Sequence, residues 1–255
     1  MGVLIWDFDG VIVDTVRECY ILTLRTIAKQ RPYLASEAGI EKFSPIPFRD
    51  FETYRSKSVN AADFFANYIL HMAGKELNEE NLEMVTEKHR PFLKKMDVAF
   101  YEEREKLMNE DKDAYFRTLK VYKGIPEVLG ALSGLGIRHA IMSARDSHSI
   151  RQILAHFKLL SHFEFIIGHE VNKGDRHVKG KQISLLKRHF AGMQGPIPDT
   201  SIEYFFIDDI PFNLRKVAGE TELLFAGWGY GKLEEGYVEA KKVKKPGSLL
   251  TMFRA

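Results

Sequence analysis

The sequence predicts an α/β protein in which a parallel sheet is interrupted, after its first strand, by an all-helical insertion. Beyond residue 119, short apolar runs alternate with helix-forming segments, which is typical of βαβ units. Between residues 15 and 118, apolar residues recur at helical spacing without strand-like alternation. The third observation is that three apolar runs end directly in polar residues, at Asp7, Ser143 and Asp208.

The first strand is expected at the apolar run Val3–Trp6, which is followed at once by Asp7, Phe8, Asp9 and Gly10. The run is too short for a lone helix and suits a strand that is buried on both faces. If the strand continues to Asp9, then Asp7 and Asp9 point the same way, because side chains alternate along a strand. Gly10 allows a sharp turn and a close backbone approach to a ligand. A plain strand end followed by an Asp-Gly turn is the alternative interpretation.

The insertion is expected to begin with a helix from Thr15 to about Lys29 and to contain a clear amphipathic helix over Asn60–Met72. A further helical pattern starts at Asn78, in a stretch that resembles a capping box. Pro91 is expected to break or kink that pattern. Loops are expected at Arg31–Pro32 and at 44–47, and the basic residues that could meet an anionic substrate tail are Arg49, Arg55 and Lys57.

After the insertion, a helix with proline in its first turn is expected to start near Gly124. In open parallel sheets, ligands bind outside the carboxyl ends of the strands, at a switch point in strand order. We therefore expect the three polar strand ends to converge on one crevice, with the helical insertion above it as a lid. The further expected strands are Ile137–Met142, Phe163–Ile167, Tyr204–Ile207 and Leu223–Ala226, and the further expected helices are Ile150–Phe157 and Lys179–Phe190.

Composition argues against nucleic acid and membranes as partners. The 255 residues include 37 basic and 35 acidic side chains, so the net charge of +2 creates no strong field. The basic cluster of Lys241, Lys242, Lys244 and Lys245 is interpreted as a solvated helix face or a terminal tail. No apolar stretch has the length of a transmembrane helix, and no signal peptide precedes the first strand, so a cytoplasmic protein is expected. The single cysteine, Cys19, cannot form an intrachain disulfide and suits a packing role.

The nine residues from Asp7 to Thr15 resemble the first motif of the haloacid dehalogenase-like (HAD) superfamily, Asp-x-Asp-Gly-x-x-x-Asp-Thr/Ser. Ser143, at the end of an apolar run, resembles the second motif of that superfamily. The pair Asp208-Asp209, followed by Asn213, resembles the fourth motif in its Asp-Asp form. The resemblance therefore extends over the whole chain.

The third motif of the superfamily is a lysine at the start of the helix that precedes the acidic pair. Lys179 is the best match, and Lys173 and Lys181 are the alternatives. The stretch Trp228-Gly229-Tyr230-Gly231 resembles one that follows the last strand in phosphoglycolate-phosphatase-like members. The resemblance implies the HAD fold, with a Rossmann-like catalytic core formed by residues 1–14 and 119–255 and an α-helical cap domain formed by residues 15–118.

The resemblance also implies a Mg²⁺ site, with Asp7 as nucleophile and metal ligand and Asp209 as a further ligand. Asp9 would bind the metal through its backbone carbonyl and act as general acid and base, and Ser143 and Lys179 would bind the phosphoryl group. Two unit charges about 4 Å apart repel by roughly 4 kcal/mol at an effective dielectric of about 20, so clustered carboxylates need a cation. An all-oxygen ligand set suits Mg²⁺. Candidates for supporting the site without direct ligation are Asp208, Asn213, Gly10 and Arg145.

These roles predict a Mg²⁺-dependent phosphatase that hydrolyses a small phosphorylated metabolite through an aspartyl-phosphate intermediate. Asp9 favours phosphoester chemistry, because members that displace halide lack this second aspartate. A sugar phosphomutase and a catalytically silent HAD-like binding protein remain as alternatives. A response-regulator receiver also has an acidic cluster, but it is about half this length and lacks the insertion. Arg145 departs from the family pattern, and it either contacts the substrate or lies on the surface.

Overall fold

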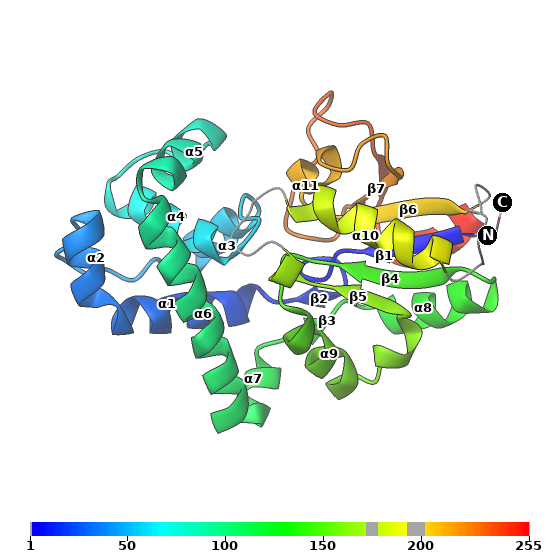
Figure 1. Ribbon diagram of the computed structural model, residues 1–255, viewed down its shortest axis with the longest axis horizontal. Helices are drawn as coiled ribbons and strands as arrows, with labels where there is room; N and C mark the ends of the chain where they lie inside the picture. The colour runs from blue at the N-terminus through cyan, green and yellow to red at the C-terminus, as the bar shows by residue number, and fades with distance from the viewer. Residues whose placement is uncertain (1, 172–177, 193–201, 255) are drawn as a thin grey trace. The chain divides into compact units, whose positions relative to one another are not determined.

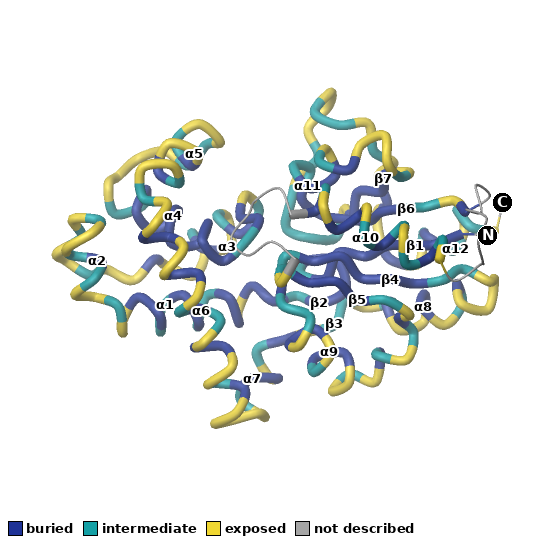
Figure 2. The backbone as a smooth tube through the Cα atoms, viewed as in Figure 1, coloured by how far each residue is buried: buried dark blue, intermediate teal, exposed yellow. Residues whose placement is uncertain are grey.

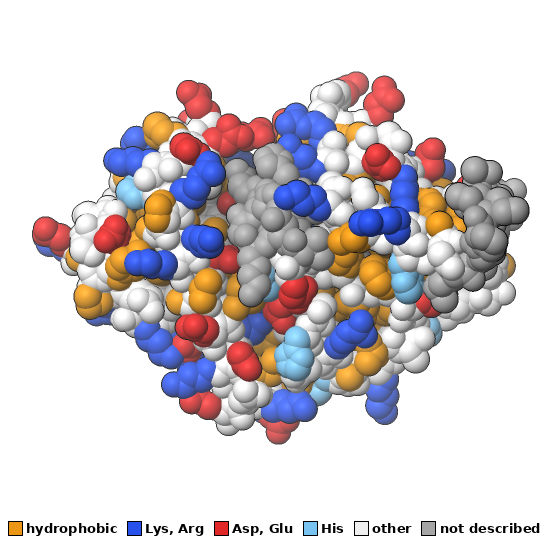
Figure 3. Space-filling view, in the orientation of Figure 1, with side chains coloured by type: hydrophobic (Ala, Val, Ile, Leu, Met, Phe, Trp, Pro, Cys, Tyr) orange, Lys and Arg blue, Asp and Glu red, His pale blue; other side chains and the backbone are white. Residues whose placement is uncertain are grey.

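The computed structural model describes residues 2–171, 178–192 and 202–254. The chain forms two compact units, which Figure 1 shows as ribbons. The core unit comprises Met1–Asp14 and Lys120–Ala255, and the cap unit comprises Thr15–Leu119. In the described part of the chain, no helix combines the length and the apolar character that a membrane span requires. Basic and acidic side chains are interspersed over the face that Figure 3 shows.

The core unit is built on a six-stranded parallel sheet in the order β5-β4-β1-β6-β7-β8. β1 lies in the middle, and its Trp6 is level with Ile141 of β4 on one side and Ile207 of β6 on the other. The chain runs from β1 to β4 in one direction and from β6 to β7 in the other, so the switch point lies between β1 and β6. The strands are β1 (Gly2–Trp6), β4 (Arg138–Met142), β5 (Phe165–Ile167), β6 (Glu203–Asp208), β7 (Glu222–Ala226) and β8 (Lys241–Val243).

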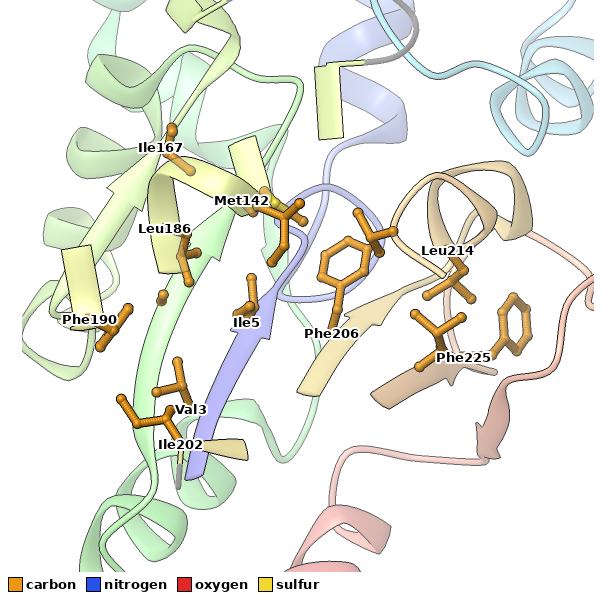
Figure 4. Close-up of a cluster of buried hydrophobic side chains, with 14 residues drawn as sticks. Val3, Ile5, Met142, Ile167, Leu186, Phe190, Ile202, Phe206, Leu214 and Phe225 are labelled. Atoms are coloured by element: carbon orange, nitrogen blue, oxygen red, sulfur yellow. The ribbon is translucent and has the colours of Figure 1, made fainter. Parts of the chain in front are cut away.

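The sheet is buried on both faces, as the dark central strands of Figure 2 show. Val3 and Ile5 of β1 pack on one face with Leu186 and Phe190 of α10 and Leu214 of α11, in the cluster drawn in Figure 4. Because side chains alternate along a strand, the neighbouring positions of β4 lie on the other face, where His139 contacts the Leu129 carbonyl of α8. The core helices are α8 (Ile125–Gly134), α9 (Ser147–His156), α10 (Val178–Gly192), α11 (Pro211–Arg215) and α12 (Ser248–Phe253), with short 3₁₀ turns at Leu160–His162 and His169–Val171.

A small antiparallel ribbon marks the place where the cap unit is inserted. β2 (Val13–Asp14) pairs with β3 (Lys120–Val121), so that Val13 is opposite Val121. The ribbon continues into a hydrogen bond from the Tyr122 N–H to the Ile12 carbonyl, 3.1 Å long. Both ends of the insertion therefore belong to one short element of the core unit, directly after β1.

The cap unit is all-helical, and an aromatic core holds it together. α4 begins after Asn60, whose side chain accepts a hydrogen bond from the Asp63 N–H and so caps the helix. Phe64 and Phe65 of this helix pack against Phe100 of α6, with ring centroids 5.6 and 6.3 Å apart. The cap helices are α1 (Val16–Lys29), α2 (Arg31–Ala38), α3 (Phe48–Arg55), α4 (Ala61–Met72), α5 (Glu79–Lys88), α6 (Arg90–Glu110) and α7 (Lys112–Arg117).

A buried carboxylate ties three cap helices to one another. Glu18 of α1 accepts a 2.7 Å hydrogen bond from Arg104 Nε of α6 and a 3.0 Å bond from the Tyr115 hydroxyl of α7. Both Glu18 and Arg104 are buried, so each charge relies on the other to offset the loss of hydration. Cys19 is buried next to Glu18, in keeping with a packing role.

Two expectations for the cap unit were wrong. Arg31–Pro32 does not form a loop: Pro32 lies in the first turn of α2, where its missing N–H has no helical partner to lose. Arg55 is buried, and its guanidinium donates to the Ser58 carbonyl at 2.9 Å, so it supports the α3–α4 turn. Arg49 and Lys57 remain exposed, as a contact with an anionic substrate tail would require.

Two expectations for the core unit were also wrong. Leu223–Ala226 is not the last strand, because Lys241 and Lys242 belong to the edge strand β8 rather than to a helix face or tail. Exposed lysines on a short edge strand discourage pairing with another sheet, and they also remove the apolar alternation by which strands are recognised. The first strand does not continue to Asp9: it ends at Trp6, and the Phe8 carbonyl accepts from the N–H groups of Ile12 and Val13 in a tight turn.

Candidate active site

The polar residues at the carboxyl ends of β1, β4 and β6 lie at one edge of the sheet. These strands are neighbours, and Trp6, Ile141 and Ile207 are level with one another. Asp7 continues the ladder by donating its N–H to the Ile207 carbonyl at 2.9 Å. The strand ends thus bring Asp7, Ser143 and Asp208 together beside the switch point, and all three side chains are buried.

Lys179 places a positive charge against Asp7. It lies in the first turn of α10, has no exposed surface, and its Nζ is 2.5 Å from Asp7 Oδ1 and 3.6 Å from Asp208 Oδ2. Its ammonium group also donates to the Met142 carbonyl. Lys181, two residues further along the helix, is exposed, and Lys173 lies outside the described residues.

Three carboxylates gather around this lysine. Asp7, Asp208 and Asp209 each have a carboxylate oxygen within 4.8 Å of the others, and all three are buried. Asp208 accepts from the Ile210 N–H at 2.8 Å and from Asn213 Nδ2 at 3.0 Å. Burial raises the pKa of Asp208 well above its ordinary value, and the charge of Asp7 raises it further, while Lys179 opposes the shift.

Glycines bring the backbone close to Asp209 from two sides. Gly10 has a φ of +84°, and a Cβ at this position would overlap the Asp209 carboxylate. A Cβ on Gly229 would overlap the Asp209 Cβ and the Gly10 carbonyl, and one on Gly231 would overlap the Asp209 carbonyl. The Tyr230 N–H then donates to Asp209 Oδ2 at 2.6 Å. The loops after β1 and β7 therefore enclose Asp209 only because these three positions lack side chains.

The aromatic residues of the loop after β7 fasten it to the turn after β1. Trp228 Nε1 donates to the Val11 carbonyl at 3.0 Å, and the Tyr230 hydroxyl donates to Asp14 Oδ1 at 3.0 Å. This gives the Trp228-Gly229-Tyr230-Gly231 stretch a mechanical role: its aromatic residues hold the loop, and its glycines allow the close approach.

Asp9 and Arg145 form a partly buried ion pair, which the sequence did not reveal. Arg145 Nε lies 3.0 and 3.2 Å from the two Asp9 oxygens, and its Nη2 lies 2.9 Å from Oδ1. The Arg145 side chain has no exposed surface, so of the two interpretations left open the surface position was wrong. Its contact is with Asp9, 136 residues away in the chain.

Gln182 is a site residue that sequence reasoning missed. It lies in α10 three residues after Lys179, on the same helix face, and it is fully buried. Its Nε2 donates to the Ser143 carbonyl at 2.7 Å and to the Gly168 carbonyl at 2.8 Å. It therefore joins the loops after β4 and β5. The spacing from Lys179 was the only signal in the sequence that could have indicated it.

Buried carboxylates with oxygens this close to one another are suited to a divalent cation. A single lysine cannot offset three carboxylates, and oxygen ligands are those that hard divalent cations prefer. Asp7 would then be one of the groups that hold the cation while its carboxylate contacts the Lys179 ammonium group, and the buried Ser143 follows the neighbouring strand β4. This arrangement can bind an anion and present one carboxylate oxygen to it as a nucleophile.

Residues 4–177 match the family model described as haloacid dehalogenase-like hydrolase. The chain belongs to this family. The match covers well over half of the sequence and includes Asp7, Asp9, Ser143 and Arg145. The expected α/β fold with a parallel sheet, and the expected membership in the HAD superfamily, are thereby confirmed.

Solved structures with low sequence identity share the fold of this HAD-like hydrolase. A predicted phosphoglycolate phosphatase from Haemophilus somnus has 12% identity and a TM-score of 0.65, over 98% of this chain and 96% of that one. A predicted phosphatase from Clostridium acetobutylicum has 15% identity and a TM-score of 0.62, over 99% and 98% of the two chains. The protein tyrosine kinase A (PtkA) of Mycobacterium tuberculosis has 18% identity and a TM-score of 0.62, over 99% and 98%.

In sequence, the HAD-like hydrolase also matches curated proteins named tyrosine-protein kinase PtkA, from Mycobacterium tuberculosis and Mycobacterium bovis. The identity is 27% over 115 residues, which is 45% of this chain. The match spans 37% of the length of these relatives.

Proposed function

We propose that this HAD-like hydrolase is a Mg²⁺-dependent phosphatase that hydrolyses a small phosphorylated metabolite through an aspartyl-phosphate on Asp7. The observation that carries the proposal is the position of Asp7. Its carboxylate lies against the buried Lys179 and within 4.8 Å of oxygens of Asp208 and Asp209. A carboxylate that lies beside an ammonium group and near other carboxylates that can bind a metal is suited to attack a phosphoryl group as a nucleophile.

Asp7, Asp209 and the Asp9 backbone carbonyl are the groups that would hold the metal. Bound there, Mg²⁺ would neutralise charge on the phosphoryl oxygens and orient them. The enclosure of Asp209 by Gly10 and Gly229 supports a fixed position for this ligand. Asp208 is engaged by Ile210, Asn213 and Lys179, which favours a role in holding the lysine rather than the metal.

In the proposed reaction, a carboxylate oxygen of Asp7 attacks phosphorus while the bond to the leaving oxygen breaks. Asp9 gives its proton to that oxygen, and the alcohol departs. Asp9 then takes a proton from water, whose oxygen attacks phosphorus and breaks the bond to Asp7, so that inorganic phosphate is released. Ser143 donates a hydrogen bond to the phosphoryl group, and Lys179 offsets its negative charge throughout.

We assign these chemical steps to the core unit, because every residue named for them belongs to it. The cap unit is then the part that selects the leaving group and excludes water. The support for this assignment is topological: the insertion leaves and re-enters the core unit through β2 and β3, directly after the turn that holds Asp9.

Hydrolysis of 4-nitrophenyl phosphate, measured with Mg²⁺ and after chelation, tests the proposal. Asp7→Asn preserves shape but removes the nucleophile, so it should lower turnover by about a hundredfold or more. Asp113→Asn changes an exposed aspartate of α7 in the same way and should leave turnover unchanged. Turnover that resists chelation, or that survives in Asp7→Asn, would contradict the proposed chemistry. If activity depends on Mg²⁺ and on Asp7, a screen of phosphorylated metabolites would identify the substrate.

A second candidate is transfer of the phosphoryl group to an acceptor other than water. The match to proteins named tyrosine-protein kinase PtkA favours this possibility for tyrosine, and the same aspartyl-phosphate could serve a sugar phosphomutase. Incubation with ATP, followed by detection of phosphotyrosine on the chain and on added protein, tests the first. Release of inorganic phosphate without any phosphorylated acceptor would leave hydrolysis as the function.

A further inference from the structure

The ion pair between Arg145 and Asp9 has the geometry of a clamp. Nε contacts both carboxylate oxygens at 3.0 and 3.2 Å, and Nη2 contacts one of them at 2.9 Å. The guanidinium is planar and its donors are fixed relative to one another, so contacts from two of its nitrogens fix the direction of a carboxylate as well as its position. The Arg145 side chain has no exposed surface, and that of Asp9 is 14% exposed.

The backbone that carries Arg145 is itself held in place. The Arg145 N–H donates to Ser143 Oγ at 3.2 Å, and the Arg145 carbonyl accepts from the His169 N–H at 3.1 Å. The next residue, Asp146, caps α9 by accepting from the Ser149 N–H at 2.7 Å. A Cβ on Gly168 would overlap the Arg145 carbonyl, so the loop after β5 also packs closely against it. The guanidinium is therefore presented to Asp9 from a constrained loop.

We infer that Arg145 is a positioning residue that holds the Asp9 carboxyl group in the orientation needed for proton transfer to the leaving oxygen. The inference rests on the proposed function, in which Asp9 is the general acid and base. Burying an arginine is costly unless it is paired, and here its partner is the one carboxylate that must face the departing group. Arg145 acts through Asp9 and need not touch the substrate.

If Arg145 positions the general acid, the effect of replacing it on the rate of hydrolysis should depend on the leaving group. Phenol is a poorer leaving group than 4-nitrophenol and needs a proton more, while the two phosphate esters differ little in shape. Loss of a well-placed acid therefore slows phenyl phosphate more than 4-nitrophenyl phosphate. General acid catalysis supplies about 10²–10⁴-fold, and a misplaced acid forfeits part of this factor.

The experiment compares kcat/KM for phenyl phosphate and 4-nitrophenyl phosphate in Arg145→Gln, Arg145→Lys and the unmodified chain. In Arg145→Gln, the ratio of the two values should move against phenyl phosphate by about tenfold. Arg145→Lys keeps the charge but loses the planar fork, so it should recover part of the ratio. Thermal unfolding of each variant establishes that the comparison is made on folded protein.

The chain offers a matched control at the other end of β4. Arg138 contacts Glu164 with the same geometry, through Nε to both oxygens at 3.0 and 2.9 Å and through Nη2 at 2.6 Å. It lies at the amino end of the strand, away from the carboxyl-end site. Arg138→Gln should leave both kcat/KM values, and therefore their ratio, unchanged.

A double-mutant cycle separates action through Asp9 from other roles. In an Asp9→Asn background, Arg145→Gln should produce no further change in the phenyl to 4-nitrophenyl ratio, because its target is gone. Equal losses for both substrates, or a KM that rises alike for both, would overturn the inference and make Arg145 a structural or phosphate-binding residue. If the unmodified chain shows no turnover that depends on Asp7, the proposed function fails instead, and the positioning of Asp9 fails with it.

Discussion

At the scale of single residues, Lys179 shows how the site tolerates a buried charge. Its ammonium group is completely buried but lies against oxygens of Asp7, Asp208 and Met142. A charge removed from water in this way is tolerated only when it is paired and hydrogen-bonded. The same contacts place it beside the proposed nucleophile, so the stabilising contacts and the proposed chemical role belong to one side chain.

Replacement of Lys179 by alanine should lower kcat/KM for phosphoester hydrolysis by about a hundredfold or more. The reason is that the variant loses the positive charge next to the phosphoryl group and leaves two buried carboxylates without their partner. Steady-state kinetics with 4-nitrophenyl phosphate measure the effect. Lys181→Ala is the matched control, because Lys181 is exposed on the same helix and should be dispensable. A larger loss in Lys181→Ala would mean that the lysine assignment is displaced by two residues.

Sequence reasoning works at this scale where strand geometry brings residues together, and it fails where tertiary contacts do. Asp7, Ser143 and Asp208 could be grouped in advance because each follows an apolar run and parallel strands end at one edge. The contact between Arg145 and Asp9 could not be predicted, because the turn after β1 reorients Asp9 and no periodicity links residues 136 positions apart.

At the scale of helices and strands, long amphipathic helices with caps were predictable and short elements were not. α4 begins at its Asn60 cap, and α5 ends before Pro91, as expected. α2 and α3 have eight residues each, and α2 has in its first turn a proline that is equally typical of a loop. β8 has three residues, two of them exposed lysines, so it carries no strand signal of its own. Only pairing with β7 makes it a strand.

Two glycines in the core unit should respond to alanine in opposite ways. Gly130 is exposed in the middle of α8 and an added Cβ would meet nothing within 4 Å, so Gly130→Ala should stabilise the protein by about 1 kcal/mol. Gly229→Ala would force a Cβ into Asp209 and should displace the loop after β7, at a cost of about 1–3 kcal/mol. Chemical denaturation measures both changes.

Gly229→Ala should also raise the Mg²⁺ concentration needed for half-maximal activity, by about tenfold, because Asp209 would no longer be held in place. Gly130→Ala is the control and should keep the Mg²⁺ dependence of the unmodified chain. Equal Mg²⁺ dependence in both variants would show that the enclosure of Asp209 does not matter for metal binding.

At the scale of the whole molecule, the sheet of the core unit carries the site, and a buried histidine couples its stability to pH. His139 lies in β4 and accepts a hydrogen bond at Nδ1 from Trp6 Nε1, 3.1 Å away. Acceptance at Nδ1 requires the neutral ring. The pKa of His139 is lowered from 6.5 to about 4: burial is the largest cause and the nearby His162 adds to it, while the Leu129 carbonyl and Glu164 oppose the shift.

The sign of the effect on stability follows from the direction of this shift. Between pH 6.5 and about 4, the unfolded chain binds a proton on His139 that the folded chain excludes. Protonation therefore favours unfolding, and the contribution of the neutral ring is complete above pH 6.5 and is lost as the pH falls toward 4. A pKa difference of this size between the unfolded and the folded chain contributes about 3 kcal/mol at most to the free energy of unfolding.

His139→Gln should therefore unfold with a shallower pH dependence than the unmodified chain. Both tryptophans, Trp6 and Trp228, belong to the core unit, so their fluorescence during urea denaturation reports on that unit. Between pH 7 and pH 4.5, the free energy of unfolding should fall by about 2–3 kcal/mol less in the variant than in the unmodified chain. At pH 7 the variant should be less stable, because a buried hydrogen bond is lost.

His156→Gln changes an exposed histidine of α9 and should keep the full pH dependence of the unmodified chain. Carboxylates titrate in all three proteins and cancel in the comparison, so identical pH profiles for His139→Gln and the unmodified chain would show that the ring of His139 is not held neutral.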